Sequence, residues 1–283
     1  RCNGSYLRFL VETTRQASNR LIIDSHCHVW PDDIAPKVLG TKIAGLEPMG
    51  DGTVGSLLAK MDEAGIDYGC CLGVATAAKN LEKTNEFIGS LDRSRLVPFG
   101  TIHPDRTVAD NMRSLRENEI VGVKLHPNFQ NLDLADPRVI EICHAIAQDG
   151  IVVITHAGEG SDAAATDRGS PEKVLALAQS VPNLTLMACH YGAYHQLELA
   201  EKIVVGSRVI LETSWPPTMA ILDPDRIRGI IKRHGADQVV FGSDWPMADP
   251  GAEIAGIRAL GLPEDDEKKI LGGNLARILG LQK

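Results

Sequence analysis

The residues of this chain that are best suited to binding a metal ion follow short apolar runs. The first run is followed by His26 and His28, whose side chains point to the same side if this segment is a strand. Far downstream, His156, His190 and Asp244 each follow another such run. Imidazole nitrogens and carboxylate oxygens are ligands that zinc and similar ions accept. This arrangement therefore predicts a metal site and favours an enzyme.

Eight apolar runs alternate with amphipathic helical patterns after residue 20. The expected strands are 21–26, 67–74, 95–102, 120–125, 151–155, 184–189, 208–212 and 238–242. They are rich in Val, Ile and Leu and nearly all apolar, which is typical of strands buried on both faces in a parallel sheet. Eight strand–helix units predict a single (β/α)8 TIM barrel, in which the carboxyl ends of all strands meet at one mouth.

A doubly wound open sheet is the structural alternative. That fold usually has a glycine-rich phosphate turn after its first strand, and here His26-Cys27-His28 occupies the place. We expect residues 21–283 to form the barrel and residues 1–20 to be a native N-terminal extension or a remnant of expression. The segment 29–52 reads as a large loop over the mouth. Helices are expected at Val54–Ala64, ending at Gly65, and at Pro137–Gln148.

Composition narrows the class of protein further. The chain has 283 residues, 43% of them hydrophobic, and a formal net charge of −8. No Lys/Arg-rich cluster is present, which disfavours nucleic acid and anionic membranes as partners. The apolar stretches fall short of the ~20 residues that a membrane span needs. The six cysteines match no disulfide or zinc-ribbon pattern. We expect a cytoplasmic protein with buried reduced thiols and a small-molecule substrate. A homo-oligomer is compatible with this sequence.

Four motifs, taken together and in order, resemble the amidohydrolase superfamily. The nearest likeness is to its amidohydrolase-related branch (amidohydrolase 2 type), which includes lactonases and nonoxidative decarboxylases. The motifs are Ile23-Asp24-Ser25-His26-Cys27-His28, Thr155-His156-Ala157-Gly158, Cys189-His190-Tyr191-Gly192 and Phe241-Gly242-Ser243-Asp244-Trp245-Pro246. The segment 272–279 is also similar to the closing helix of that group.

The resemblance implies a role for each matching residue. His26, His28, His156 and Asp244 would bind the metal, and Asp244 would also accept a proton from the attacking water. His190 would lie close to the metal and either polarise the substrate carbonyl or handle the water proton. A neutral imidazole suits both tasks, because a nearby cation lowers its pKa.

The expected fourth strand allows three interpretations of Lys124 and His126, which point to the same side. In binuclear members of the superfamily, a carboxylated lysine at this position bridges two metals. The branch that this chain resembles often works with one metal. In a third interpretation, Lys124 and His126 bind a substrate carboxylate. We expect these two residues to bind substrate beside one divalent ion, Zn²⁺ in first place with Mn²⁺ or Fe²⁺ as alternatives. A second metal on carboxylated Lys124 is less favoured.

Three functions fit these residues. The favoured one is a metal-dependent hydrolase of a small amide, ester or lactone that uses a metal-activated water. The alternative is a metal-dependent nonoxidative decarboxylase of an aromatic or unsaturated acid. A barrel that only binds a ligand is the third. Weaker site candidates are His103 and Glu212, at the ends of expected strands three and seven, and Trp215 and Trp245, as pocket walls or as packing.

Overall fold

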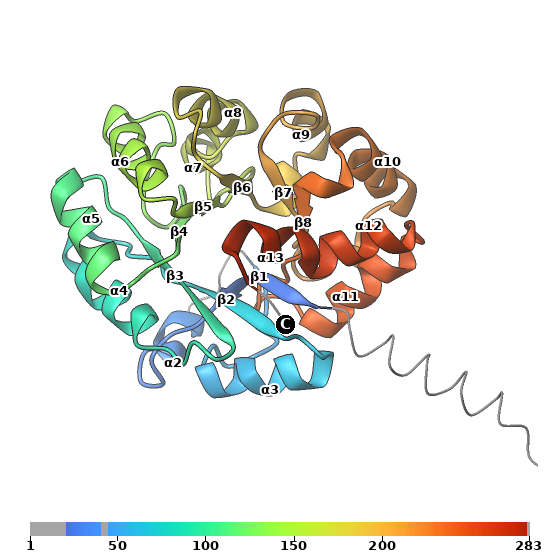
Figure 1. Ribbon diagram of the computed structural model, residues 1–283, viewed down its shortest axis with the longest axis horizontal. Helices are drawn as coiled ribbons and strands as arrows, with labels where there is room; N and C mark the ends of the chain where they lie inside the picture. Colours follow the sequence, from blue (N-terminus) through green and yellow to red (C-terminus); the bar gives the residue numbers. More distant parts are fainter. Residues whose placement is uncertain (1–20, 41–44, 282–283) are drawn as a thin grey trace, which may run out of the picture.

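A computed structural model, which describes residues 21–40 and 45–281, shows eight parallel strands surrounded by helices (Figure 1). The strands are β1 Ile23–His28, β2 Tyr68–Leu72, β3 Leu96–Thr101, β4 Gly122–Leu125, β5 Val152–Thr155, β6 Leu186–Ala188, β7 Ile210–Glu212 and β8 Val239–Val240. Their order in the sheet is their order in the chain. The end of β8 meets β1 through hydrogen bonds from Ser25 N to Phe241 O (3.0 Å) and from Asp244 N to His26 O (2.9 Å). The predicted (β/α)8 barrel is confirmed.

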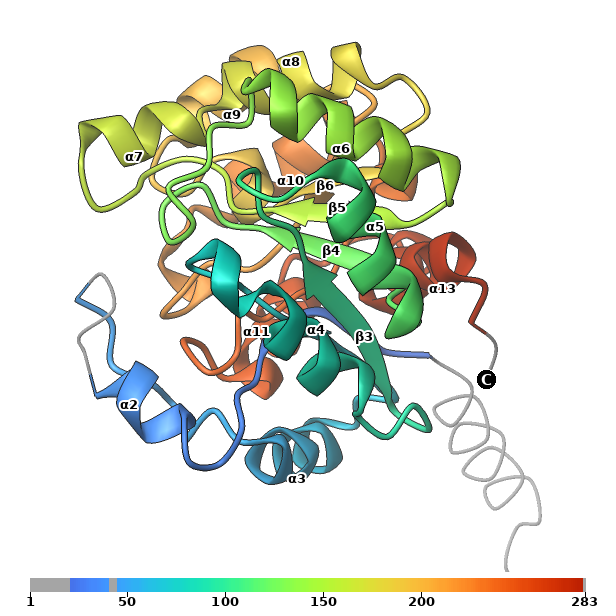
Figure 2. The same cartoon turned by 90° about the vertical axis from the view of Figure 1, so that its left-hand side faces the viewer.

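The helices lie outside the strands, as Figures 1 and 2 show. The helices are α2 Ala35–Leu39, α3 Val54–Ala64, α4 Leu81–Gly89, α5 Val108–Glu117, α6 Pro137–Gln148, α7 Ala163–Arg168, α8 Pro171–Ser180, α9 Leu197–Ile203, α10 Pro224–His234, α11 Pro250–Ala259, α12 Glu264–Lys268 and α13 Asn274–Leu279. Helices α3 and α6 have the predicted bounds. Gly65 ends α3 in the left-handed conformation, with φ of 70°, which glycine adopts without steric cost.

Seven of the eight predicted strands are longer than the observed ones, and the predicted strand 21–26 is observed two residues later, as β1. Two of the longer ones end beside functional residues. The run 184–189 contains β6, Leu186–Ala188, and the run 238–242 contains β8, Val239–Val240. An apolar run predicts that its side chains are buried, whereas a strand also requires backbone hydrogen bonds to a neighbouring strand. Beyond both strands the backbone turns sharply, and His190 (φ 60°) and Asp244 (φ 67°) adopt the left-handed conformation. Few non-glycine residues do so, and those that do cluster at functional sites.

The inside of the barrel is packed with apolar side chains that alternate with those facing the helices. Phe99 is fully buried there, against Gly122. A Cβ added to Gly122 would lie 2.3 Å from the Phe99 ring, so only glycine leaves room for this aromatic side chain. Leu275 and Ala276 of α13 belong to the same cluster as the strand residues, and α13 lies beside the start of β1 in Figure 1.

The cysteines, the chain segments outside the barrel and the lengths of the helices were also subjects of prediction. The five cysteines within the described residues are free and buried, as predicted. The expected N-terminal extension, residues 1–20, lies outside the described residues, as do residues 41–44 of the expected mouth loop. No helix of the described part is long and apolar enough to cross a membrane.

A buried carboxyl in α11 predicts how stability depends on pH. Glu253 is 1% exposed, and burial raises its pKa to about 8 from the usual 4.5. The folded state therefore holds this proton more tightly than the unfolded chain, so the stability it supports falls as pH rises from about 4.5 to about 8. Glu253→Gln should melt at nearly the wild-type temperature at pH 5 and several degrees above it at pH 9. Thermal unfolding at both pH values tests this, and an equal difference at both would contradict it.

Candidate metal centre

Three donor side chains meet where β1 ends and the chain leaves β8. His26 Nε2 lies 3.2 Å from His28 Nε2 and 3.1 Å from Asp244 Oδ1, and His28 Nε2 lies 3.7 Å from the same oxygen. These residues form a group whose ligand atoms all lie within 4.8 Å of one another. Two ligands that are each about 2.1 Å from one tetrahedral ion lie roughly 3.4 Å apart, so the spacing fits a single metal ion.

The protonation sites of these histidines suit a metal as well. His26 Nδ1 lies 3.1 Å from Glu212 Oε2, so it donates to this carboxylate and leaves the lone pair on Nε2. Burial, followed by the charge of Lys124, lowers the pKa of His26 well below its usual value and that of His28 to about 3. Both imidazoles are therefore neutral at pH 7, the form that binds metals.

Asp244 completes this group from the other side. Burial raises the pKa of its carboxyl well above the usual value, and the charge of Lys124 opposes that rise. A carboxylate held between two imidazole nitrogens and removed from water requires a compensating cation. Two imidazole nitrogens and one carboxylate oxygen that face one point are a donor set that fits a divalent ion.

His156 and His190 form a second pair of rings on the same cavity. His156 Nδ1 lies 3.1 Å from His190 Nε2, and His156 Nε2 lies 3.0 Å from the carbonyl oxygen of Glu159. The ring centroids of His190 and His26 are 5.7 Å apart. The four predicted ligands are thus not all equally close: His156 lies beside His190, outside the group of His26, His28 and Asp244. Its role as a ligand stays a prediction.

The two side chains of β4 lie at different depths. His126 lines the cavity and stacks on His156 with 4.7 Å between ring centroids. Lys124 is fully buried, and its amino nitrogen lies 3.0 Å from His26 Nε2 and 3.3 Å from Cys189 Sγ. In this structure it does not line the cavity, so the expected contact of Lys124 with substrate is not visible here. Residues two apart on a strand share a side but are separated by about 6.6 Å along it.

A second potential donor group lies beneath the first. It comprises His26, Cys189 and Glu212, all fully buried. Here the Glu212 carboxylate accepts from His26 Nδ1, and the Cys189 thiol is 3.3 Å from the Lys124 amino nitrogen. Because the Glu212 carboxylate and the Cys189 thiol already have partners in the protein, this group is less suited to a metal than the group at the cavity.

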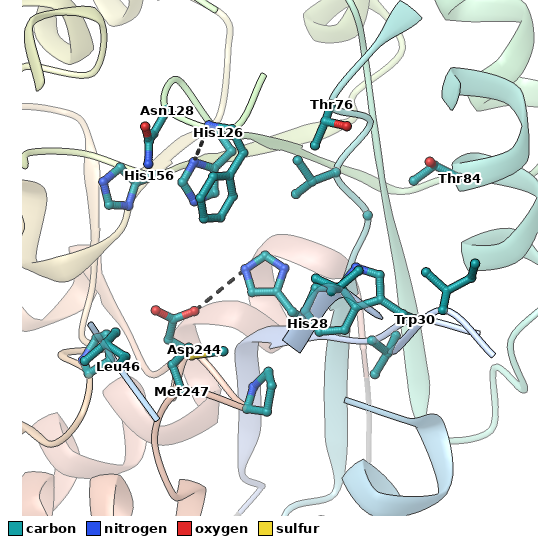
Figure 3. A pocket seen from close by; sticks show the side chains of 18 of the residues that line it. His28, Trp30, Leu46, Thr76, Thr84, His126, Asn128, His156, Asp244 and Met247 are labelled. Atoms are coloured by element: carbon teal, nitrogen blue, oxygen red, sulfur yellow. Dashed lines mark hydrogen bonds and ion pairs between the residues drawn. The ribbon is translucent and has the colours of Figure 1, made fainter. Parts of the chain in front are cut away.

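A cavity of about 600 Å³ opens over the first donor group. Figure 3 shows His28 and Asp244 facing each other across its floor, with His126 and His156 on one side and Trp30 beside His28. Most of the remaining wall is apolar and comes from Trp30, Pro31, Ile34, Val38, Leu46, Val74, Phe87, Ile88, Phe129, Pro246 and Met247. No arginine is among the described residues that line it.

The aromatic part of this wall was not predicted. The ring of Trp30 stacks on His28 with 6.0 Å between centroids, and Phe129 stacks on His126 with 4.0 Å between centroids. Both residues lie in loops, where the sequence has no hydrophobic periodicity from which the direction of a side chain could be predicted. The segment 29–52 does reach the cavity as expected, through Trp30, Ile34 and Leu46.

The weaker candidates divide between packing and lining. Trp215 is 3% exposed and Trp245 fully buried, and neither lines the cavity, so both are packing residues. His103 lines a separate polar cleft beside Arg138 rather than the main cavity. Glu212 does not line the cavity, and its carboxylate contacts His26 instead. Its neighbour Ser214, which bonds the same carboxylate, was not predicted.

Fold and site together define a (β/α)8 barrel with a candidate metal centre at its carboxyl mouth. The chain belongs to the amidohydrolase family, whose model matches residues 23–281. The predicted resemblance is thereby confirmed. No curated protein sequence matches the chain.

Solved structures share the fold at low sequence identity. A dihydroxybenzoic acid decarboxylase from a Polaromonas species, with bound manganese and an inhibitor, is 16% identical at a TM-score of 0.72, covering 93% of this chain and 98% of its own. The 5-carboxyvanillate decarboxylase of Sphingomonas paucimobilis is 16% identical at a TM-score of 0.68, covering 93% and 100%. A candidate 2-pyrone-4,6-dicarboxylic acid hydrolase of Pseudomonas putida is 17% identical at 0.66, covering 93% and 100%.

Proposed function

We propose that this protein is a metal-dependent enzyme that removes the carboxyl group from an aromatic or unsaturated acid without an oxidant. His26, His28 and Asp244 would hold one divalent ion, with His156 as the expected fourth ligand. A bound ion would polarise the nearest substrate oxygens and offset the negative charge that develops as the carboxyl group leaves. The observation that carries the proposal is the apolar, ring-lined wall beside this donor group.

The wall supports decarboxylation for a physical reason. A planar ring gains contact area against Trp30 and Phe129, whereas its carboxylate loses hydration in the same place. In the transition state the charge spreads from the carboxylate into the ring, so an apolar surface opposes it less than it opposes the localised starting charge. Two of the structures with the same fold belong to decarboxylases, which agrees with this choice.

The chemistry balances with the residues at hand. The bond between the ring carbon and the carboxyl carbon breaks, carbon dioxide leaves, and the electron pair stays on the ring carbon. Asp244 lines the cavity, so its carboxylate would take up one proton from solvent and deliver it to that carbon, which returns Asp244 to its ionised form.

Hydrolysis, the function favoured from the sequence, is the second candidate. It draws support from the lone pair on His190 Nε2, because this nitrogen could accept a proton from a water molecule attacking a carbonyl. The metal centre would be the same in both reactions. The apolar wall of the cavity favours decarboxylation over hydrolysis, since a polar lactone or amide gains little binding energy from contact with aromatic side chains.

The discriminating experiment offers the metal-reconstituted protein two substrate sets of matched size, hydroxylated aromatic acids and aromatic lactones. Decarboxylation predicts release of carbon dioxide and, in heavy water, one deuterium at the vacated ring carbon. Ring opening of lactones without loss of carbon dioxide would contradict the proposal and support hydrolysis. Turnover of neither set by a protein that binds the metal would favour the binding-only barrel.

Loss of the aromatic wall should weaken substrate binding and leave the metal in place. Trp30→Ala is expected to raise KM about fivefold, since stacking on an aromatic side chain contributes about 1 kcal/mol. Trp30→Phe keeps a ring and serves as the control, with a much smaller change. Steady-state kinetics and metal content of both variants test this. A loss of metal in Trp30→Ala would show that the residue acts on the site and not on the substrate.

A further inference from the structure

A buried hydrogen-bonded unit at the end of β7 lies directly below the donor group. It consists of Glu212, the last residue of the strand, and Ser214, and both are fully buried. Glu212 Oε1 accepts from the backbone N–H of Ser214 at 2.5 Å, and Oε2 accepts from the Ser214 hydroxyl at 2.8 Å. The carboxylate is therefore held in one orientation by its own strand end.

This unit determines which nitrogen of His26 carries the proton. Glu212 Oε2 lies 3.1 Å from His26 Nδ1. Burial raises the pKa of Glu212 to about 7, but both of its oxygens already accept from Ser214, which is the arrangement of an ionised carboxylate that only accepts hydrogen bonds. Nδ1 is thus the protonated nitrogen, and the lone pair of Nε2 points toward His28 and Asp244. The Lys124 amino nitrogen, 3.0 Å from His26 Nε2, agrees with this assignment because it can donate to that lone pair.

The same unit determines the protonation of His190. His190 Nδ1 lies 3.1 Å from the carbonyl oxygen of Ser214 and 3.0 Å from its hydroxyl oxygen. The hydroxyl proton is directed at Glu212, so both oxygens of Ser214 act as acceptors toward His190. His190 Nδ1 must then donate, which leaves the lone pair of the neutral ring on Nε2. Because His156 Nε2 donates to the carbonyl oxygen of Glu159, His156 Nδ1 also carries a lone pair, so the two nitrogens that face each other at 3.1 Å require a shared proton or a metal ion.

From these contacts we infer that Glu212 and Ser214 act as one positioning unit for both histidines. The unit determines that Nδ1 carries the proton in both rings. His26, a proposed metal ligand, and His190 therefore both keep the lone pair on Nε2. Such partners of ligating histidines orient the ring and typically change metal affinity about 10–100-fold. The inference rests on the proposed metal site for its effect on affinity, but the protonation sites can be measured without any metal.

Gly242 provides an independent observation for the same unit. A Cβ at this position would lie 2.2 Å from Glu212 Oε1 and 2.8 Å from Ser25 Oγ. Glycine is required here because the carboxylate occupies the space that a side chain would need. Gly242→Ala should therefore displace the Glu212 carboxylate while every side chain of the donor group stays chemically unchanged.

The test is Glu212→Gln, with Glu253→Gln as the matched control at another buried carboxyl, which bonds Met219 N and no histidine. Glutamine presents one acceptor and one donor group, so it cannot accept from Ser214 N, Ser214 Oγ and His26 Nδ1 together. In metal-free protein, nitrogen-15 NMR of the imidazoles should show Nδ1-protonated His26 and His190 in wild type and in Glu253→Gln. In Glu212→Gln, the proton of His26 should move to Nε2.

Metal affinity, measured by calorimetric titration with Zn²⁺, should fall about 10–100-fold in Glu212→Gln and stay within about twofold in Glu253→Gln. Unchanged histidine protonation in Glu212→Gln would overturn the inference. A shifted proton on His26 in a protein whose wild type binds no Zn²⁺ would support the positioning unit and contradict the metal site. If Glu212→Gln does not fold, Gly242→Ala carries the test: it should lower Zn²⁺ affinity as well, and wild-type affinity there would overturn the inference.

Discussion

Replacing His26 with alanine is expected to abolish stoichiometric metal binding and, with it, turnover. His26 Nε2 is the one nitrogen that lies close to both His28 Nε2 and Asp244 Oδ1, at 3.2 and 3.1 Å. Removal of a residue that merely orients a ligand costs about 10–100-fold in affinity, so loss of the ligand itself should cost more than about 100-fold. Metal content after dialysis and a calorimetric titration measure the effect.

His144→Ala is the matched control for this variant. His144 lies on the exposed face of α6, away from the cavity, so its loss should leave metal content and turnover as in wild type. Retention of one metal ion per chain in folded His26→Ala protein would contradict the assignment of the donor group.

Asp244→Asn is expected to lower kcat about 100- to 10,000-fold, the range that a positioned acid or base contributes. Asparagine has nearly the size of aspartate, but it cannot give up or take a proton at neutral pH, and it is a weaker metal ligand. The assay is therefore run at saturating metal, with the bound metal counted in the same sample. In that way a loss of chemistry is distinguished from a loss of the ion.

Asp265→Asn provides the control for the change of charge, because the Asp265 side chain is 89% exposed on α12. It should leave kcat unchanged. A kcat of Asp244→Asn within about threefold of wild type, with the metal bound, would remove Asp244 from any proton transfer in either proposed reaction.

Much of the barrel could be predicted because one physical rule governs it. Strands buried on both faces are nearly all apolar, and parallel strands must be separated by helices, so eight alternations predict the fold. The same rule predicts that strand ends meet at one mouth, which is why His26, His28 and Asp244 could be grouped although they are far apart in the chain. Strand bounds were less predictable, because an apolar residue such as Leu184 is buried although it lies outside β6 and its N–H bonds the turn at Val181.

Other features of the site depend on distances that the sequence does not contain. Lys124 and His126 share one side of β4, but the layers of the barrel interior place Lys124 below the cavity floor and His126 on its wall. The position of Trp30 depends on the path of a loop. The contact of Glu212 with His26 joins residues 186 positions apart, and only the closed barrel brings strands β1 and β7 that near.

Both proposed reactions require one divalent ion held by strand ends at the mouth of the barrel. A crystal of the protein soaked with Zn²⁺ or Mn²⁺, with anomalous scattering recorded at the absorption edge of the metal, tests this most directly. We predict a single strong peak about 2.0–2.3 Å from His26 Nε2, His28 Nε2 and a carboxylate oxygen of Asp244. No peak at full soaking, or a peak that none of these three residues contacts, would contradict the account.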